Sequence, residues 1–270
     1  MSQTNFLIGR GELLTHDIKG PKRKPGKAEV YTLQQAIERL SPKFTQVANA
    51  IDALPSEACP GDFGIARLTM NPSYIARSFF PVAMLRTVGL ESVGSRTVKL
   101  MPDGWTKKGA PTECTTTELF IAGKRRAFRN LEAWTQQIEL ESDEALDLAH
   151  IENFAAFSSE ERIADPGSKK DRFFEIGVHL LPDEERSFVQ LAFKKFAKAV
   201  NVKIHADLSF IAGNLWFVPV EGKHSDILKL ADFVFVRVIR PVPKLRGIRP
   251  LVRASGVSIG CQLPTEKPLS

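Results

Sequence analysis

The pattern of hydrophobic and polar positions is clearest between residues 172 and 240. Residues 172–180 are rich in β-branched and aromatic side chains and stop at a Leu-Pro-Asp sequence, which predicts a strand followed by a turn. Residues 184–200 then carry apolar side chains at steps of three and four, as in an amphipathic helix. Acidic residues in the first turn and lysines in the later turns suit the helix dipole. A strand and a helix therefore open this stretch.

The second half of the same stretch returns to a period of two. Apolar and polar residues alternate over 202–210, which predicts a half-buried strand. The Ala-Gly-Asn turn at 212–214 leads into a returning strand at 215–218. Ser225 can cap a short helix, and 234–239 closes the set as a last strand. The order β-α-β-β-α-β predicts a ferredoxin-like unit.

The same order of elements recurs upstream, which indicates a duplicated architecture. Its members are again recognised by the switch between a period of two and helical spacing. The expected elements are a strand at 63–70, a helix at 71–88 that is disturbed at Pro81, strands at 90–100 and 116–122, a helix at 124–138 and a strand at 151–157.

A further helix is predicted before this first unit, at 32–54, where apolar residues keep helical spacing. Thr32 is a suitable N-cap. Pro42 predicts a break or kink, because proline lacks the backbone N–H that an interior helical position donates.

These elements predict an α+β chain with two ferredoxin-like units. After 239, five prolines interrupt the sequence, so an extended, basic tail is expected there. The expected division is an N-terminal arm and helix at 1–62, a first unit at 63–164, a second unit at 165–240 and the tail at 241–270.

Composition narrows the class of protein. Of the 270 residues, 43% are hydrophobic and 25% are charged, as in an ordinary globular protein. No apolar run is long enough for a membrane span, so no membrane partner is expected. The three cysteines are far apart and form no CxxC, which favours a reducing, cytoplasmic location over a disulfide scaffold.

The sequence offers little that resembles catalytic or cofactor chemistry. Residues 256–260 fit G-x-S-x-G, but no histidine follows Ser258, and the proline-rich tail cannot supply the helix that a nucleophile elbow needs. The five histidines form no metal-binding pair, so neither a metal nor another cofactor is expected. The strands lack the aromatic pattern of RNA-recognition modules, and no specific nucleic-acid partner is expected. We therefore expect these residues to be non-catalytic.

The last predicted strand suggests an interaction surface instead, because its apolar side chains point to both faces of the sheet. A ferredoxin-like sheet covers only one face with its own helices, so the other apolar face needs a second partner. Two alternatives are open: the face packs against residues 63–157 of the same chain, or it docks onto another domain. The side chains predicted for this face are Phe233, Phe235 and Ile239.

Four segments resemble a known family. They are Gly-Arg-Gly-Glu-Leu-Leu-Thr at 9–15, Leu-Thr-Met-Asn-Pro-Ser-Tyr-Ile-Ala-Arg-Ser-Phe-Phe-Pro at 68–81, Gly-Ser-Arg at 94–96 and Thr-Glu-Leu-Phe-Ile-Ala-Gly at 117–123. They are similar to the N-terminal region of bacterial S8-family, subtilisin-like serine proteases. The group concerned is the one encoded beside an AAA+ ATPase and implicated in defence against phage.

This resemblance implies a propeptide-like role. The catalytic triad would lie in a protease domain after this region, and the sheet of the second unit would dock on that domain as a chaperone and inhibitor. The tail would then approach the substrate cleft. The tail residues assigned to that contact are Arg246, Arg249, Leu251, Arg253 and Ser258.

A different class of function is also open. On this alternative the region is a protein-binding platform that recruits the AAA+ ATPase or senses a phage component. The helix at 32–54 and the long loop at 101–115 exceed what a minimal propeptide needs, which favours this alternative for the first unit.

Overall fold

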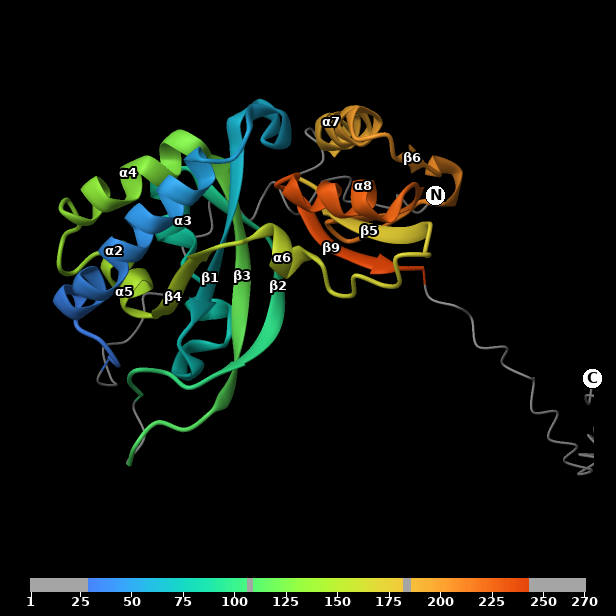
Figure 1. The fold of residues 1–270 in the computed structure, drawn as a ribbon. Helices are drawn as coiled ribbons and strands as arrows, with labels where there is room; N and C mark the ends of the chain where they lie inside the picture. Colours follow the sequence, from blue (N-terminus) through green and yellow to red (C-terminus); the bar gives the residue numbers. More distant parts are fainter. Residues whose placement is uncertain (1–28, 106–108, 182–185, 243–270) are drawn as a thin grey trace, which may run out of the picture.

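The structure is a computed structural model that describes residues 29–105, 109–181 and 186–242. These residues form a first unit and a second unit, each built on one antiparallel sheet with helices against it (Figure 1). The α+β class predicted from the sequence is confirmed.

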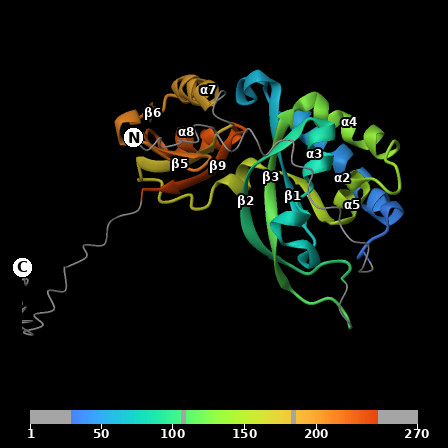
Figure 2. The same ribbon diagram turned by 180° about the vertical axis from the view of Figure 1, so that it is seen from behind.

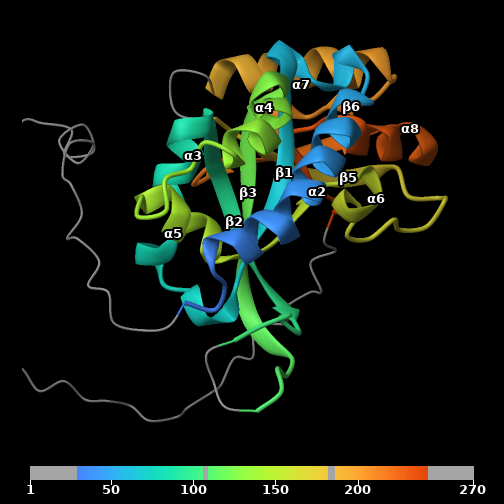
Figure 3. The same cartoon turned by 90° about the vertical axis from the view of Figure 1, so that its left-hand side faces the viewer.

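The first unit contains a four-stranded sheet in the order β2-β3-β1-β4, with every neighbouring pair antiparallel. Its helices lie together on the face of the sheet that is turned away from the second unit (Figure 3). The elements are α2 (Leu33–Asp52), β1 (Phe63–Met70), α3 (Val82–Val88), β2 (Leu90–Leu100), β3 (Cys114–Lys124), α4 (Arg125–Thr135), α5 (Asp143–Ala149) and β4 (Ile151–Ala156).

The second unit contains a sheet in the order β6-β8-β5-β9, and β7 also pairs with β8. As in the first unit, the strand that comes first along the chain is central, and here β5 lies between β8 and β9. The elements are α6 (Ser159–Arg162), which links the units, β5 (Phe173–His179), α7 (Arg186–Ala199), β6 (Lys203–Ile204), β7 (Phe210–Ala212), β8 (Leu215–Glu221), α8 (His224–Leu228) and β9 (Val236–Pro241).

A break or kink was predicted at Pro42, and the break does not occur, because α2 continues through this residue. Thr32 begins the helix with a capping box that it shares with Gln35, as its N-cap assignment predicted. The helix then buries one apolar stripe, and Phe44 meets Phe154 of β4 edge to face, with ring centroids 5.0 Å apart. Burying such a stripe outweighs the roughly 3 kcal/mol that an interior proline costs.

Three other predicted elements differ in extent. Only Val82–Val88 of the helix expected at 71–88 is α-helical, because prolines at 72 and 81 leave two short 3₁₀ turns before it. The strand expected at 202–210 is interrupted by the 3₁₀ turn Ala206–Leu208. Helix α8 has Lys223, not Ser225, at its N-cap position.

The two units share a hydrophobic core. On the first sheet, the helix-free face carries Phe63, Ile65 and Phe120, and these side chains belong to the same buried cluster as the interior of the second unit. The rings of Phe63 and Phe235 lie 5.8 Å apart across this joint. Strand β2 runs along the side of the first unit that faces the second (Figure 2). Each large buried side chain contributes about 1.5–3 kcal/mol, so the joint is a packed interior and not a flexible hinge.

The linker between the units is fastened by one buried arginine. Arg162 ends α6 and is 1% exposed. Its guanidinium donates to the carbonyl oxygens of Phe157 (2.8 Å), Ala231 (2.6 Å) and Phe233 (3.2 Å). These three carbonyls come from both sides of the linker, so Arg162 holds the end of the first unit against the last turn of the second.

Candidate functional site: the open face of the second sheet

The second sheet has one face covered by helices and one face without them. Along β5, Phe174, Ile176 and Val178 are fully buried, whereas Phe173 is 51% exposed. Strand β8 shows the same alternation, with Trp216 buried and packed edge to face on Phe193 of α7. Successive strand residues point to opposite faces, so the less buried set must lie on the side away from the helices.

The pairing of the strands places aromatic side chains next to one another on the face that has no helices. Phe210 of β7 pairs with Phe217 of β8, and Phe217 pairs with Gly177 of β5. The rings of Phe210 and Phe217 are stacked with centroids 5.2 Å apart, and Phe210 remains 55% exposed. We call the surface formed by Phe173, Gly177, Phe210, Phe217 and Val238 the open face.

Gly177 lets side chains of β8 and β9 approach each other across the central strand β5. A Cβ atom at this position would lie 2.8 Å from Cγ1 of Val238 and 3.3 Å from a ring carbon of Phe217. The first distance is shorter than real Cβ contacts allow, so a side chain here would push its neighbours apart. The absence of a side chain therefore makes the open face continuous from β8 to β9.

Charges beside the open face are already paired within the chain. Arg240 of β9 donates to Glu175 of β5 through Nε at 2.8 Å. His205 lies 3.1 Å from Glu221, measured between Nε2 and Oε2, and its ring is 6.2 Å from that of Phe173. A partner that covers this surface would therefore meet exposed aromatic rings and ion pairs that already have their counter-charges. Such a surface suits an apolar partner surface.

The interaction face predicted from the sequence is not the face that is open. Phe233, Phe235 and Ile239 are all fully buried. Of the two alternatives, packing within the chain is the one found, since Phe233 meets Phe193 of α7 and Phe235 meets Phe63 of the first unit.

A change of register explains this error. Strand β9 begins only at Val236, and an irregularity in its pairing with β5 places Gly177 opposite Val238 but Val178 opposite Val236. The extra residue, Arg237, breaks the simple alternation that the prediction assumed. The predicted tail contacts Arg246, Arg249, Leu251, Arg253 and Ser258 lie outside the described residues.

The sequence analysis missed Phe173, Phe210 and Phe217. One signal was available, because the run Leu215-Trp216-Phe217-Val218 is apolar at both parities and must place large side chains on both faces of the sheet. Phe210 was assigned to a longer strand, whereas the turn before it makes β7 a separate three-residue strand.

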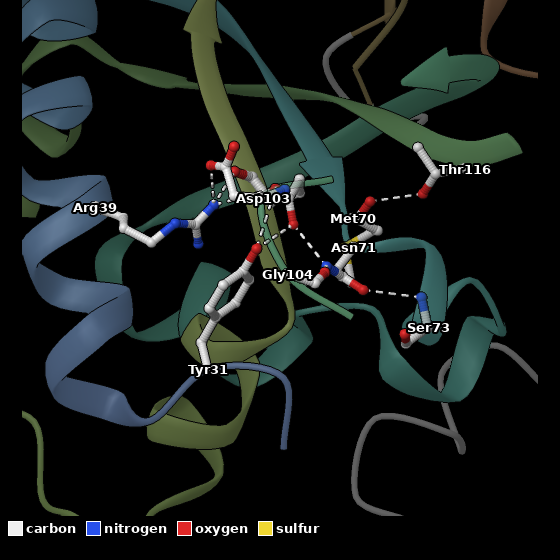
Figure 4. Close-up of polar contacts among 9 residues, drawn as sticks. Tyr31, Arg39, Met70, Asn71, Ser73, Asp103, Gly104 and Thr116 are labelled. Carbon is white, nitrogen blue, oxygen red and sulfur yellow. Dashed lines mark hydrogen bonds and ion pairs between the residues drawn. The ribbon is translucent and has the colours of Figure 1, made fainter. Parts of the chain in front are cut away.

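A buried polar cluster lies elsewhere, in the first unit, and its bonds are internal (Figure 4). Glu152 of β4 is 5% exposed and accepts hydrogen bonds through both carboxylate oxygens. Oε2 accepts from the Tyr31 hydroxyl (2.9 Å) and Asn71 Nδ2 (2.6 Å), and Oε1 accepts from the Asp103 backbone (2.8 Å) and Arg39 Nη2 (3.2 Å). Burial, followed by the charge of Glu152, raises the pKa of Tyr31. Because its four donors join α2, β4 and the loop after β2, we interpret this cluster as a structural fastening.

Glu152→Gln is expected to lower the free energy of unfolding by about 2–3 kcal/mol. Each carboxylate oxygen faces two donors, so either orientation of the amide sets its NH₂ group against donors that it cannot satisfy. Urea unfolding followed by circular dichroism measures the change. Asp103→Asn is the control, because that side chain is 73% exposed and should leave stability nearly unchanged.

No family model, curated protein or solved structure matches this chain in the comparisons made with each. Among the residues that the structure describes, no group of three or more histidine, cysteine, aspartate or glutamate side chains is placed to hold a metal ion. No helix within the same residues is long and apolar enough to cross a membrane. The open face is therefore the candidate site on which a proposal is built.

Proposed function

We propose that this chain is a non-catalytic, propeptide-like regulatory region of a subtilisin-like serine endopeptidase, and that its open face docks on the protease domain. The observation that carries the proposal is the exposed aromatic surface of the second sheet, on which Phe173 and Phe210 are each about half exposed. Such large side chains are rarely left in water without a partner.

The topology supports the same proposal. In each unit the first strand is central and all neighbouring strands are antiparallel, as in the predicted ferredoxin-like plan, to which the first unit adds helix α5 and the second unit adds strand β7. The resemblance of segments 68–81 and 117–123 to the N-terminal region of S8-family proteases adds the class of partner. In propeptides of that family, the helix-free sheet face covers surface helices of the protease.

The path of the chain supports a role for the tail. The Val242 backbone N–H donates to the Phe173 carbonyl at 3.3 Å, so the chain leaves β9 at the rim of the open face. On this proposal the tail continues into the substrate cleft while the open face holds the protease, so docking and inhibition are separate contributions. We place the complex in the cytoplasm, in keeping with the free thiols of Cys59 and Cys114.

Binding of the full chain to the separately produced protease domain tests the proposal. Phe210→Ser combined with Phe217→Ser is expected to raise the Kd about 30-fold, because one exposed and one partly buried ring that become fully buried on docking contribute roughly 1 kcal/mol each. Isothermal titration calorimetry measures the Kd. Leu191→Ser is the matched control, since Leu191 is 69% exposed on α7, on the opposite side of the sheet.

A chain ending at residue 241 separates docking from inhibition. It is expected to bind the protease domain but to inhibit peptide cleavage poorly. If the wild-type chain neither binds nor inhibits the protease domain, the proposal is wrong. Equal loss of binding in the Leu191 control would instead mean that the open face is not the docking surface.

One observation favours a second function, recruitment of the AAA+ ATPase. The β2–β3 pair continues past the end of β1, because Thr97–Leu100 pair only with residues 114–117, and Met101 beyond them is 70% exposed. Figure 3 shows this two-stranded ribbon projecting beyond the rest of the first unit. We propose it as the ATPase contact, and a pull-down with the ribbon shortened by two residues on each strand tests it. Undiminished capture of the ATPase would exclude the ribbon.

A further inference from the structure

Two arginines from different units lie near the same aromatic ring at the boundary between the two sheets, which we call the crease. Arg237 of β9 lies with its guanidinium carbon 3.7 Å from the centroid of the Phe120 ring, and Arg96 of β2 lies 5.5 Å from the same centroid. Phe120 itself is fully buried. One aromatic ring therefore brings together two positive charges that come from distant parts of the chain.

The nearby carboxylates, Glu118 and Glu161, already accept hydrogen bonds from other side chains. Glu118 accepts from Arg67 Nη1 (3.3 Å) and Thr69 (3.4 Å) at Oε1, and from Arg96 Nε (2.5 Å) at Oε2. Glu161 pairs with Arg67 Nη2 at 2.8 Å. Arg67 and Arg96 thus occupy both carboxylates, and one positive charge at the crease has no ion pair within the described residues.

That remaining charge is Arg237. Its side chain is partly buried, and it has neither a hydrogen bond nor an ion pair within the described residues. Burial, and then the charge of Arg96, lower its pKa to about 10. The charge of Glu118 opposes this shift, but Glu118 forms no ion pair with Arg237 within the described residues. Burying a guanidinium without a paired carboxylate is unfavourable, and contact with an aromatic face offsets only part of that cost.

An oxyanion would supply the negative charge and the paired oxygen acceptors that these two guanidinium groups lack. A guanidinium presents planar pairs of N–H donors that match two oxygens of a carboxylate or phosphate. The terminal nitrogens of Arg96 carry no hydrogen bond in the described part of the chain, since its bond to Glu118 uses Nε. Both side chains are partly exposed, so an anion can reach them from solvent.

We propose that Arg96 and Arg237 form a binding site for an oxyanion, a carboxylate or a phosphate group, at the crease between the two units. The site is distinct from the open face, and it stands independently of the proposed protease partner. Because one arginine belongs to each unit, a bound anion links β2 to β9 across the joint.

Titration of the full chain with inorganic phosphate, and separately with acetate, tests the site and distinguishes the two sources of oxyanion. Backbone amide shifts measured by NMR at constant ionic strength are expected to saturate for residues of β2 and β9 with at least one of these anions. Arg237→Gln is expected to weaken that binding at least tenfold, and Arg237→Lys to give an intermediate value, because lysine keeps the charge but not the paired donors.

Arg240→Gln is the matched control, because Arg240 lies on the same strand but is already paired with Glu175. It is expected to leave the anion affinity within twofold of wild type. Saturation by neither anion would overturn the proposal. Equal weakening by Arg237→Gln and Arg240→Gln would overturn it as well, since that result indicates general electrostatic attraction. Amide spectra without anion establish that the Arg237 variants are folded.

Discussion

Replacing Arg162 with methionine is expected to lower the free energy of unfolding by about 3 kcal/mol. The substitution keeps the length of the side chain but removes every donor, and it leaves the carbonyl oxygens of Phe157 and Ala231 without the hydrogen bonds that Arg162 donates. The Phe233 carbonyl also loses its bond from Arg162 but keeps one from the Val236 backbone N–H at 2.9 Å. Each unsatisfied buried acceptor costs about 1–3 kcal/mol, and removing a desolvated charge returns part of this sum. Chemical unfolding followed by intrinsic tryptophan fluorescence measures the change.

Two further variants make this expectation specific to the guanidinium. Arg162→Lys should destabilise nearly as much, because one ammonium group cannot reach three diverging carbonyls with the geometry of a planar fork. Arg129→Met should leave the unfolding midpoint nearly unchanged, because Arg129 is a surface residue that pairs with Asp52 in solvent. A loss for Arg162→Met as small as that for Arg129→Met would contradict the assigned role.

The second large effect is a loss of stability in acid that depends on His179. This residue ends β5 at the joint, 1% exposed, with its ring 5.1 Å from Phe120 and close to Gly94 of β2. Burial, followed by the charge of Arg237, lowers the pKa of His179 to about 3. The Val93 backbone opposes this shift only weakly, and neither ring nitrogen makes a hydrogen bond of good geometry.

The sign of the effect follows from proton binding. Between the unfolded pKa of about 6.5 and the folded value near 3, the unfolded chain binds a proton at His179 and the folded chain does not. Stability is therefore complete above about pH 6.5 and falls as the pH is lowered, with a loss on the order of 4 kcal/mol by pH 3. Other groups also titrate in this range, so the contribution of His179 appears as a difference between variants.

His179→Leu is expected to flatten this part of the pH profile. Urea midpoints measured from pH 8 to pH 4 for the wild type and the variant give the comparison. The reference point is pH 8, where the imidazole is neutral in both the folded and the unfolded chain. Parallel profiles over the whole range would show that His179 does not control the acid sensitivity.

Helices and strands were predicted best from the sequence where the element buries apolar side chains in one continuous core. Val189 and Phe193 form the stripe of α7 as expected, and the strands around Ile65 and Ile176 lie where the apolar runs placed them. Their patterns are strong because each element packs against a single, continuous core. The α+β class follows from these elements alone.

The candidate site was harder to predict, because its position depends on contacts between distant residues. The alternation in 202–210 looks like one strand, but the His205 N–H bonds the Pro219 carbonyl, and the chain then turns before Phe210. Phe233 and Phe235 precede β9, and the extra residue within that strand changes which face Val238 and Ile239 occupy, which no local pattern reveals. Arg162 gave no signal either, because a buried arginine has the same sequence appearance as a solvated one.

The core shared by Phe63, Phe120 and Phe235 has a consequence for how the chain acquires its structure. Phe63 and Phe120 belong to the first unit, whereas Phe235 lies near the end of the second, so the joint forms only after strands of both units are in place. Until then each unit exposes a sheet surface that belongs in the interior. Folding of the two units is therefore cooperative, and hydrogen exchange in β1 and β9 should report the same opening free energy. A cut between them at residue 164 would yield two aggregation-prone halves in place of two independent domains.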